Sequence, residues 1–243
     1  MGIANAKYDY IAFLDADDYW GASYLQKNAE LINKETNVAI IGSHYSTNKD
    51  DIAHTDEKLQ YSLIKNYFKN AIRNTVFFTS ATVVSKAFFY QQSGFNPKLK
   101  IGEDLDVWFR VILSGGNHYF IDNTLVYYSN EDVNQATKKK TEPSTSLLFY
   151  LPELELNFYS KFKNEEFDKY LSKLKYQGLR YHFFQNTTHQ LAKNVLESSK
   201  KRYFLADLYY FLPFSWGNKL NENLTFRKKS RIYFKFLFRY IYK

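Results

Sequence analysis

The 243-residue sequence contains no cysteine, and this absence removes several classes of chemistry at once. Without thiols the chain has no disulfide framework, no thiolate zinc site and no cysteine nucleophile. A reducing compartment is the simplest setting for a protein of this composition.

Long apolar runs are also absent. The sequence contains no stretch of about 18 apolar residues, so it predicts no membrane-spanning helix. Residues 1–10 lack the basic region and apolar run of a signal peptide, and Ala6 stands where a myristoylation signal requires Ser or Thr. These features predict a cytoplasmic protein.

Apolar residues are plentiful, whereas positive charge is confined to one segment. Hydrophobic residues make up 45% of the chain, which is enough for one domain with an appendage or for two small domains. The net charge is +8, but residues 225–243 hold seven Lys or Arg and no acid, so the other 224 residues carry about +1. The basicity therefore belongs to the C-terminal tail.

Buried strands and amphipathic helices alternate through the first half of the chain. Apolar, branched and aromatic runs predict strands, and apolar residues at helical spacing predict helices. The predicted strands are 10–16, 38–46 and 80–84, with a strand, turn and strand at 118–128; the predicted helices include 57–72, 86–92 and 103–114. This alternation predicts an α/β fold with a mostly parallel sheet.

A change of composition divides the chain. Residues 136–146 are polar and include a basic triplet and a proline, which is typical of a linker. Helical patterns dominate beyond it. We therefore expect a first domain at 1–135, a linker at 136–146 and a helical region at 147–243.

The sequence IAFLDADDYW at 11–20 places carboxylates directly after a predicted strand. Asp15 and Asp17 are two residues apart, so in a regular strand they lean to the same side, and α/β sheets bind ligands at strand ends. Two such close charges favour an oxygen-ligated Mg²⁺ or Mn²⁺, whose shell water and substrate phosphates complete. The alternative is a solvated turn in which Asp18 or Ser23 caps the next helix.

Tyr19 argues against two other acidic motifs. It stands where an EF-hand loop needs an oxygen donor, and the required glycine is missing as well. A phosphatase of the haloacid dehalogenase type would have Thr or Val at this position.

The second acidic motif is GEDLDVWFR at 102–110. Glu103 and Asp104 fall in the first turn of a predicted helix, where the helix dipole favours negative charge. Capping of that helix is one explanation. The other is a carboxylate that accepts a proton from a substrate hydroxyl.

Together, FLDADDYW, SGFNPKLKIGEDLDVWFRV and YFIDNTLVYY resemble glycosyltransferase family 2 over roughly residues 2–130. These are inverting nucleotide-sugar transferases with the A-type fold. The resemblance implies a partial, Rossmann-like A-type domain with a mostly parallel sheet, followed here by the helical region. It also implies a nucleotide-sugar donor, foremost a UDP-sugar, and a sugar or lipid-linked saccharide acceptor in bacterial surface polysaccharide assembly.

The resemblance also assigns residue roles position by position. Asp104 would be the general base, and Glu103 beside it would bind or orient the acceptor. Asp17 would ligate the Mn²⁺ or Mg²⁺ that bridges the diphosphate. Asp15 would bind the sugar nucleotide through its ribose or a metal-bound water.

The sequence departs from the family pattern in two places. The first strands, which bind the nucleotide in the family, have no counterpart ahead of Met1, so we expect a chain that lacks its N-terminal nucleotide-binding half. Either an internal Met was taken as the start of a longer gene, or the gene is truncated and its product is inactive. Many relatives also carry a His a few residues after LVYY, whereas residues 129–137 contain none.

The basic tail has a regular pattern of its own. Its basic residues at four-residue spacing would form one stripe along a helix that is otherwise rich in aromatic residues: Arg227, Arg231, Lys235, Arg239 and Lys243. Such a helix suits an anionic membrane surface, which predicts peripheral association with the inner face of the cell membrane through 225–243.

Three alternatives to this interpretation remain. The aromatic face of the tail could pack on the protein itself, leaving the charges to solubilise it. Basic residues among aromatics can also bind nucleic acid, but no nucleic-acid-binding motif accompanies them, so no nucleic acid is expected. An inactive, membrane-bound adaptor is the third.

Overall fold

The computed structural model describes residues 2–52, 57–72, 74–129 and 142–242. They form two compact units. The first comprises the described residues of Met1–Tyr67, Thr75–Pro97 and Glu103–Lys140, and the second those of Phe68–Asn74, Lys98–Gly102 and Thr141–Lys243. Within these described ranges, no helix combines the length and apolarity needed to cross a membrane.

The first unit is built on a six-stranded sheet with the order β1-β5-β3-β6-β2, and β4 pairs with β6 as well. The strands are β1 (Tyr10–Ala12), β2 (Tyr19–Trp20), β3 (Val38–Ser46), β4 (Tyr61–Leu63), β5 (Thr82–Ser85) and β6 (Asn117–Tyr127). The long β6 serves both β4 and β2 because they pair with different stretches of it, β4 around Phe120 and β2 at Val126 and Tyr127.

The direction of the strands corrects the prediction of a mostly parallel sheet. Only β3 and β6 run parallel, whereas the other four strand pairs described are antiparallel. A parallel pair requires a long crossover, and residues 47–116 supply one between β3 and β6. Apolar runs reveal that a strand is buried but carry no information about its direction.

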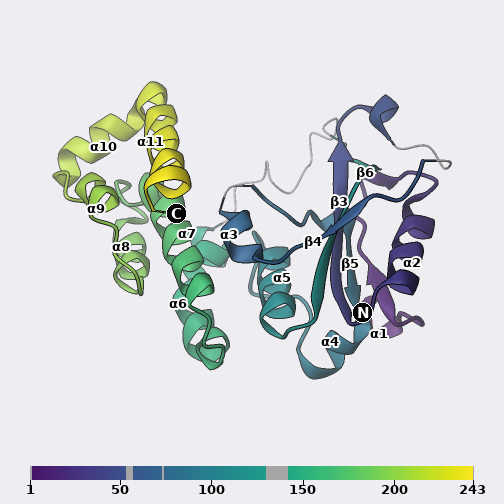
Figure 1. The fold of residues 1–243 in the computed structure, drawn as a ribbon. Helices are drawn as coiled ribbons and strands as arrows, with labels where there is room; N and C mark the ends of the chain where they lie inside the picture. Colours follow the sequence, from purple (N-terminus) through teal and green to yellow (C-terminus); the bar gives the residue numbers. More distant parts are fainter. Residues whose placement is uncertain (1, 53–56, 73, 130–141, 243) are drawn as a thin grey trace. The chain divides into compact units, whose positions relative to one another are not determined.

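Helices cover both faces of this sheet, with α2 (Tyr24–Lys34) on one side and α5 (Glu103–Leu113) on the other (Figure 1). Tyr24 and Leu31 of α2 are fully buried in the same core cluster as residues of β3, β5 and β6. α5 buries a continuous run from Asp106 to Ile112. Two shorter helices, α1 (Gly2–Asn5) and α4 (Lys86–Gln91), complete the unit.

Several segments differ from the elements predicted for them, and two of them change type. Residues 57–72 contain the strand β4 ahead of the helix α3 (Tyr67–Ala71), and Asn117–Tyr127 form one continuous strand where a turn was expected. Asn123 explains the second difference: its Oδ1 accepts from Gln60 N (3.0 Å) and its Nδ2 donates to Lys58 O (3.2 Å). The turn-forming side chain thus supports the strand rather than ending it.

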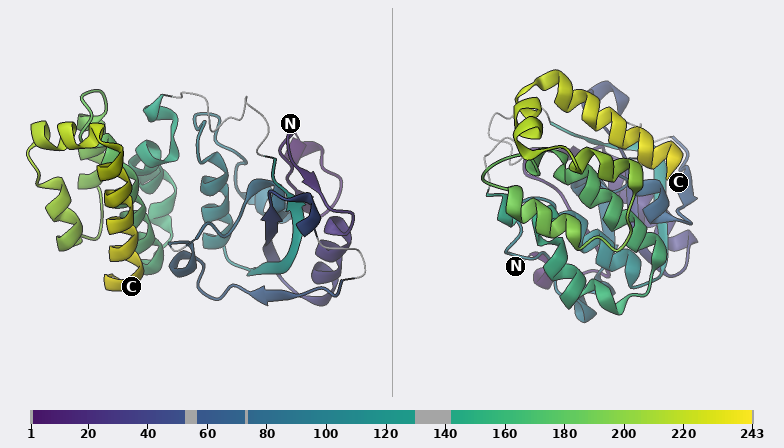
Figure 2. Two further views of the ribbon diagram at one scale, coloured as in Figure 1. Left: turned by 90° about the horizontal axis from the view of Figure 1, so that it is seen from above. Right: turned by 90° about the vertical axis from the view of Figure 1, so that its left-hand side faces the viewer.

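The second unit is helical, as the sequence predicted for 147–243 (Figure 2). Its helices after α3 are α6 (Leu147–Asn157), α7 (Glu165–His182), α8 (His189–Glu197), α9 (Phe204–Tyr210), α10 (Phe214–Glu222) and α11 (Leu224–Phe236), and a π-helical turn spans Leu237–Ile241. They enclose a second core, rich in aromatic side chains. Most of the predicted linker at 136–146 lies outside the described residues.

The tail helix α11 and the turn after it use their apolar residues in two ways. Phe234, Leu237 and Phe238 are buried in the core of the second unit. Ile232, Phe236 and Tyr240 form an exposed stripe, with 66%, 49% and 61% of their surface accessible. Packing on the protein therefore accounts for one side of the helix, and membrane association stays a prediction for the other.

Candidate functional site

The first acidic motif forms a turn at the end of β1 that a serine from a distant segment holds. Asp18 N donates to Asp15 O (3.2 Å) and closes the turn. Asp15 N donates to Ser80 Oγ (3.0 Å), and Ser80 Oγ donates to Asp18 Oδ2 (2.6 Å). Ser80 is fully buried, and its carbonyl accepts from Trp20 Nε1 at 2.7 Å.

Asp18 has a structural role in this turn. It is 8% exposed, and its second oxygen, Oδ1, accepts from Ser129 N at 3.0 Å. Both carboxylate oxygens therefore accept hydrogen bonds, which compensates for the burial of this group. Neither Asp18 nor Ser23 caps α2 with its side chain, so the capping alternative is wrong in that form.

The second acidic motif begins α5. Gly102 precedes the helix with φ +77°, a conformation that favours glycine. Asp104 lies in the first turn, where its Oδ1 accepts from Leu105 N (2.8 Å) and its Oδ2 accepts from Thr79 Oγ1 (3.1 Å). Asp104 therefore contributes to the helix start and is also oriented by a side chain from outside it.

The third carboxylate of this motif is structural. Asp106 is buried and pairs with Arg110 at 2.9 Å, and the same guanidinium donates to the carbonyls of Ser93 and Gly94. A buried charge needs such partners to offset its desolvation. The pair holds the loop before the motif against α5.

The two motifs lie close enough to influence each other. Partial withdrawal of water raises the pKa of the Asp15 carboxyl above its usual value, and the charges of Asp18, Asp17, Asp104 and Glu103 raise it further. The 3₁₀ turn η2 (Thr79–Ala81) lies between the motifs, because Thr79 contacts Asp104 and Ser80 contacts Asp15 and Asp18. The structure thus brings the four predicted site residues into one region.

Aromatic side chains border this region. Tyr45, Phe78 and Tyr128 contact one another, with ring centroids 4.6 to 5.7 Å apart. The Tyr128 pKa is raised, first by loss of water and then by the charges of Asp18 and Asp17. Tyr45 is 48% exposed and offers a ring to a ligand.

The aromatic residues nearest the motifs in sequence are used for packing instead. Trp108 is fully buried, and Phe95 contacts it edge-on at 6.4 Å. Trp20 stacks on Tyr24 at 4.6 Å.

A divalent cation fits part of this arrangement. In the described portion of the chain, no three His, Asp or Glu side chains are grouped to hold a metal ion by themselves. Mg²⁺ commonly takes only one or two protein carboxylates and completes its shell with water and phosphates. Asp15 and Asp17 suit that role, because the crowded negative charge that raises the Asp15 pKa is offset when a cation binds.

The sequence predicted Asp15, Asp17, Glu103 and Asp104 as site residues, and it did not predict Thr79 and Ser80, which bond to this region. Ser80 lies 65 positions along the chain from Asp15 and 62 from Asp18. Thr79 lies 25 positions from Asp104. No local pattern signals a contact over that separation. The sequence at 80–84 predicted a strand and gave no role to the hydroxyl groups of Thr79 and Ser80.

Comparison with known proteins finds one family whose model is similar to part of this chain. The model of the family described as glycosyl transferase family 2 matches residues 1–96, which include the first acidic motif and η2. No curated protein gives a significant match to the chain.

Solved structures give a similar fold. The crystal structure of TarS from S. aureus matches with a TM-score of 0.52 over 99% of this chain, at 13% identity, and the chain spans 41% of that protein. A structure of TarS 1–349 gives a TM-score of 0.42 at 14% identity, with 95% of this chain and 68% of that one covered. At identities this low, structural similarity is evidence for a shared fold alone. Only the first structure, with a TM-score of 0.52, supports that conclusion.

Proposed function

We propose, because residues 1–96 match the model of glycosyl transferase family 2, that the chain transfers a sugar from a nucleotide-sugar donor to an acceptor hydroxyl with inversion. The observation that carries the proposal is the meeting of the two acidic motifs at η2. Thr79 holds Asp104 and Ser80 holds the Asp15 turn, so carboxylates with different roles are kept at one place.

Asp104 is the proposed general base. It accepts the proton of the acceptor hydroxyl as the oxygen attacks the anomeric carbon, and the bond from that carbon to the diphosphate breaks on the opposite face. The bond to Thr79 fixes one oxygen of the carboxylate and thereby its orientation. Glu103, next to it in the first turn of α5, is proposed to bind or orient the acceptor.

Asp15 and Asp17 are proposed to bind the donor end. Asp17 would ligate Mn²⁺ or Mg²⁺, and Asp15 would contact the sugar nucleotide, for which we propose a UDP-sugar. When bound, the cation would offset the charge that builds up on the departing diphosphate. The crowded charge around Asp15 supports this assignment.

The finer proposal concerns location and acceptor. We propose that the protein is cytoplasmic and peripheral on the inner face of the cell membrane, where it acts on a lipid-linked saccharide in surface polysaccharide assembly. The exposed stripe Ile232, Phe236 and Tyr240, in a segment whose charges are all basic, supports this location.

Transfer measured with the 243-residue chain tests the proposal. UDP-sugars are supplied with Mn²⁺ and saccharide acceptors, and release of UDP and of product is followed. We expect Asp104→Asn to lower turnover by about 1000-fold, because general-base catalysis contributes on the order of 10²–10⁴. Asp122→Asn is the matched control, since Asp122 is an exposed carboxylate on β6 whose side chain forms no hydrogen bond among the described residues.

Two results would contradict the proposal. Equal turnover by Asp104→Asn and Asp122→Asn would remove the base assignment. A chain without transfer or hydrolysis of any donor, with and without Mn²⁺, would favour the inactive adaptor.

A further inference from the structure

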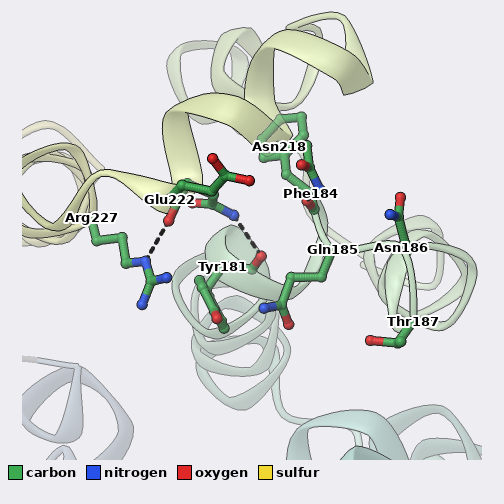
Figure 3. Close-up of a pocket in the computed structure, with 9 residues that line it drawn as sticks. Tyr181, Phe184, Gln185, Asn186, Thr187, Asn218, Glu222 and Arg227 are labelled. Atoms are coloured by element: carbon green, nitrogen blue, oxygen red, sulfur yellow. Dashed lines mark hydrogen bonds between the residues drawn. The ribbon is translucent and has the colours of Figure 1, made fainter.

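The second unit contains a pocket of about 260 Å³ that the proposed chemistry does not use (Figure 3). It is formed by the end of α7, the loop that follows it, α10 and the first turn of α11. Its lining residues are Tyr181, Phe184, Gln185, Asn186, Thr187, Asn218, Asn221, Glu222 and Arg227. All but Phe184 carry a polar group.

Hydrogen bonds between side chains and backbone hold the walls of the pocket together. Asn218 Nδ2 donates to Phe184 O and Asn221 Nδ2 donates to Tyr181 O, both at 2.8 Å, and these bonds tie α10 to the end of α7. Arg227 Nε donates to Asn221 O and adds α11 to the same assembly. The pocket is therefore formed before any ligand arrives.

Close packing beneath the pocket adds to this rigidity. Gly217 of α10 lies so near the buried Phe184 ring that an added Cβ would stand 2.1 Å from its Cδ1. Only glycine permits this approach, and it positions the neighbouring Asn218 at the pocket. The geometry of the polar side chains thus depends on a well-packed core.

Several of the lining side chains have hydrogen-bonding capacity to spare. Gln185, Asn186, Thr187 and Glu222 form no side-chain hydrogen bond among the described residues. The terminal nitrogens of Arg227 are likewise not committed to a described partner. Amides and hydroxyls both donate and accept, whereas Glu222 only accepts and Arg227 only donates.

The charge of the pocket favours a neutral ligand. Its single acid, Glu222, and its single base, Arg227, offset each other in formal charge. The Arg227 guanidinium lies over the Tyr181 ring, with 4.3 Å from its carbon to the ring centroid, so one face of the only tyrosine is already covered. A planar base would find little to stack on, whereas a molecule with many hydroxyls would match the mixed donors and acceptors.

We propose that this pocket binds one sugar unit of a saccharide, which rests on the proposed transfer to a saccharide acceptor. A volume of about 260 Å³ is below the range of drug-sized ligand sites, so it suits one or two sugar rings and not a nucleotide sugar. Glu222 and Gln185 face the ligand's hydroxyls, and Arg227 donates to its ring or hydroxyl oxygens. The pocket is thus a second binding site for the acceptor, formed by residues outside the acidic motifs.

Nuclear magnetic resonance titration of the 243-residue chain tests this inference. The probes are glucose, galactose, N-acetylglucosamine, maltotriose and chitotriose, and the side-chain amide signals of Gln185, Asn186 and Asn218 are followed. We expect at least one probe to shift these signals with a dissociation constant in the millimolar range. Glu222→Gln and Gln185→Ala are each expected to raise that constant about tenfold, the effect of losing one good hydrogen bond.

Matched controls lie on the neighbouring helix α8. Glu197→Gln and Gln190→Ala change exposed residues of the same types outside the pocket, and we expect them to leave the dissociation constant unchanged. Melting temperatures of all four variants show whether each is folded. Asp104→Asn should bind the probe as the unmodified chain does, which separates failure of this inference from failure of the proposed chemistry.

Three results would overturn the inference. They are the absence of shifts with every sugar at about 50 mM, equal affinity in the pocket and control variants, and stronger shifts with inorganic phosphate than with any sugar.

Discussion

Single hydroxyl groups decide how the candidate site is held. Ser80 Oγ accepts from the backbone of Asp15 and donates to the carboxylate of Asp18, and the neighbouring Thr79 Oγ1 donates to Asp104. Buried polar groups cost free energy when they lose a partner, so each bond restrains the atoms at both of its ends. The proposed catalytic carboxylates are thus oriented by residues that do no chemistry themselves.

Removing one of these hydroxyls tests whether it positions the site. Ser80→Ala leaves Asp18 Oδ2 and Asp15 N without their partner, and we expect a loss of about 1–3 kcal/mol of unfolding free energy. Displacement of the Asp15 turn is expected to lower kcat by about 10- to 100-fold. Urea unfolding and transfer kinetics measure the two effects.

Ser62→Ala is the matched control, because Ser62 is exposed on β4 and its side chain forms no hydrogen bond among the described residues. Rescue of kcat by Ser80→Thr, which restores a hydroxyl, would distinguish positioning from a loss of packing. Unchanged kcat in Ser80→Ala would contradict the positioning role.

Whole elements were predictable where one pattern dominates. The run VAIIGSHYS predicted the bounds of β3, Val38–Ser46, and the acidic start and double glycine predicted α5 to within one residue of its end at Leu113. β4 was missed because its three residues sit inside a helical pattern. The helical region predicted at 147–243 includes α8 and α10, but their separate bounds were not predicted, because each helix has only nine residues.

The candidate site also contains residues that a local pattern predicted and residues that it did not. The carboxylates were predicted from two short acidic motifs and a family resemblance, whereas the residues that bond to them come from η2, in another part of the chain. Hydrogen bonds between distant segments depend on the fold as a whole, and a linear pattern does not encode them. The same holds for strand direction, which depends on which segments become neighbours.

The packing of α10 gives a prediction at this scale. Gly217→Ala places a methyl group 2.1 Å from a carbon of Phe184, a fully buried ring. Overpacking lowers the free energy of unfolding by about 1–3 kcal/mol. Replacing glycine by alanine in a helix raises it by only about 0.5–1 kcal/mol. We therefore expect a net loss of stability, measured by urea unfolding.

Ser215→Ala on the same helix provides the comparison, since Ser215 is exposed and its substitution changes propensity alone. A Gly217→Ala variant as stable as Ser215→Ala would mean that α10 does not pack on Phe184 as described.

The molecule as a whole carries its charge unevenly. Of the net +8, the segment 225–243 supplies all but about +1. Two of the basic residues in this segment already have partners within the protein. Arg227 contacts Tyr181 and Asn221, and Arg239 donates to Asn74. Lys228, Lys229 and Arg231 remain exposed beside the stripe that begins at Ile232.

Binding to lipid vesicles tests the membrane proposal. We expect the chain to float with vesicles of phosphatidylglycerol and phosphatidylcholine, and to be released by salt. Replacing Lys228, Lys229 and Arg231 by Gln should weaken binding about 100-fold, since each basic residue near an anionic surface contributes about 1 kcal/mol.

Replacing the exposed Lys7, Lys58 and Lys65 of the first unit by Gln removes the same charge from another surface and should leave vesicle binding intact. Equal weakening by both sets of substitutions would show that net charge alone attracts the chain, and would contradict a role for the tail.

Because η2 bonds to both acidic motifs, substitutions in this one turn affect both of them. A substitution of Ser80 removes bonds to both Asp15 and Asp18. A substitution of the adjacent Thr79 removes the bond to Asp104. One short segment of the chain therefore orients both acidic motifs, and substitutions within it act on the geometry of the proposed site without changing any of its carboxylates.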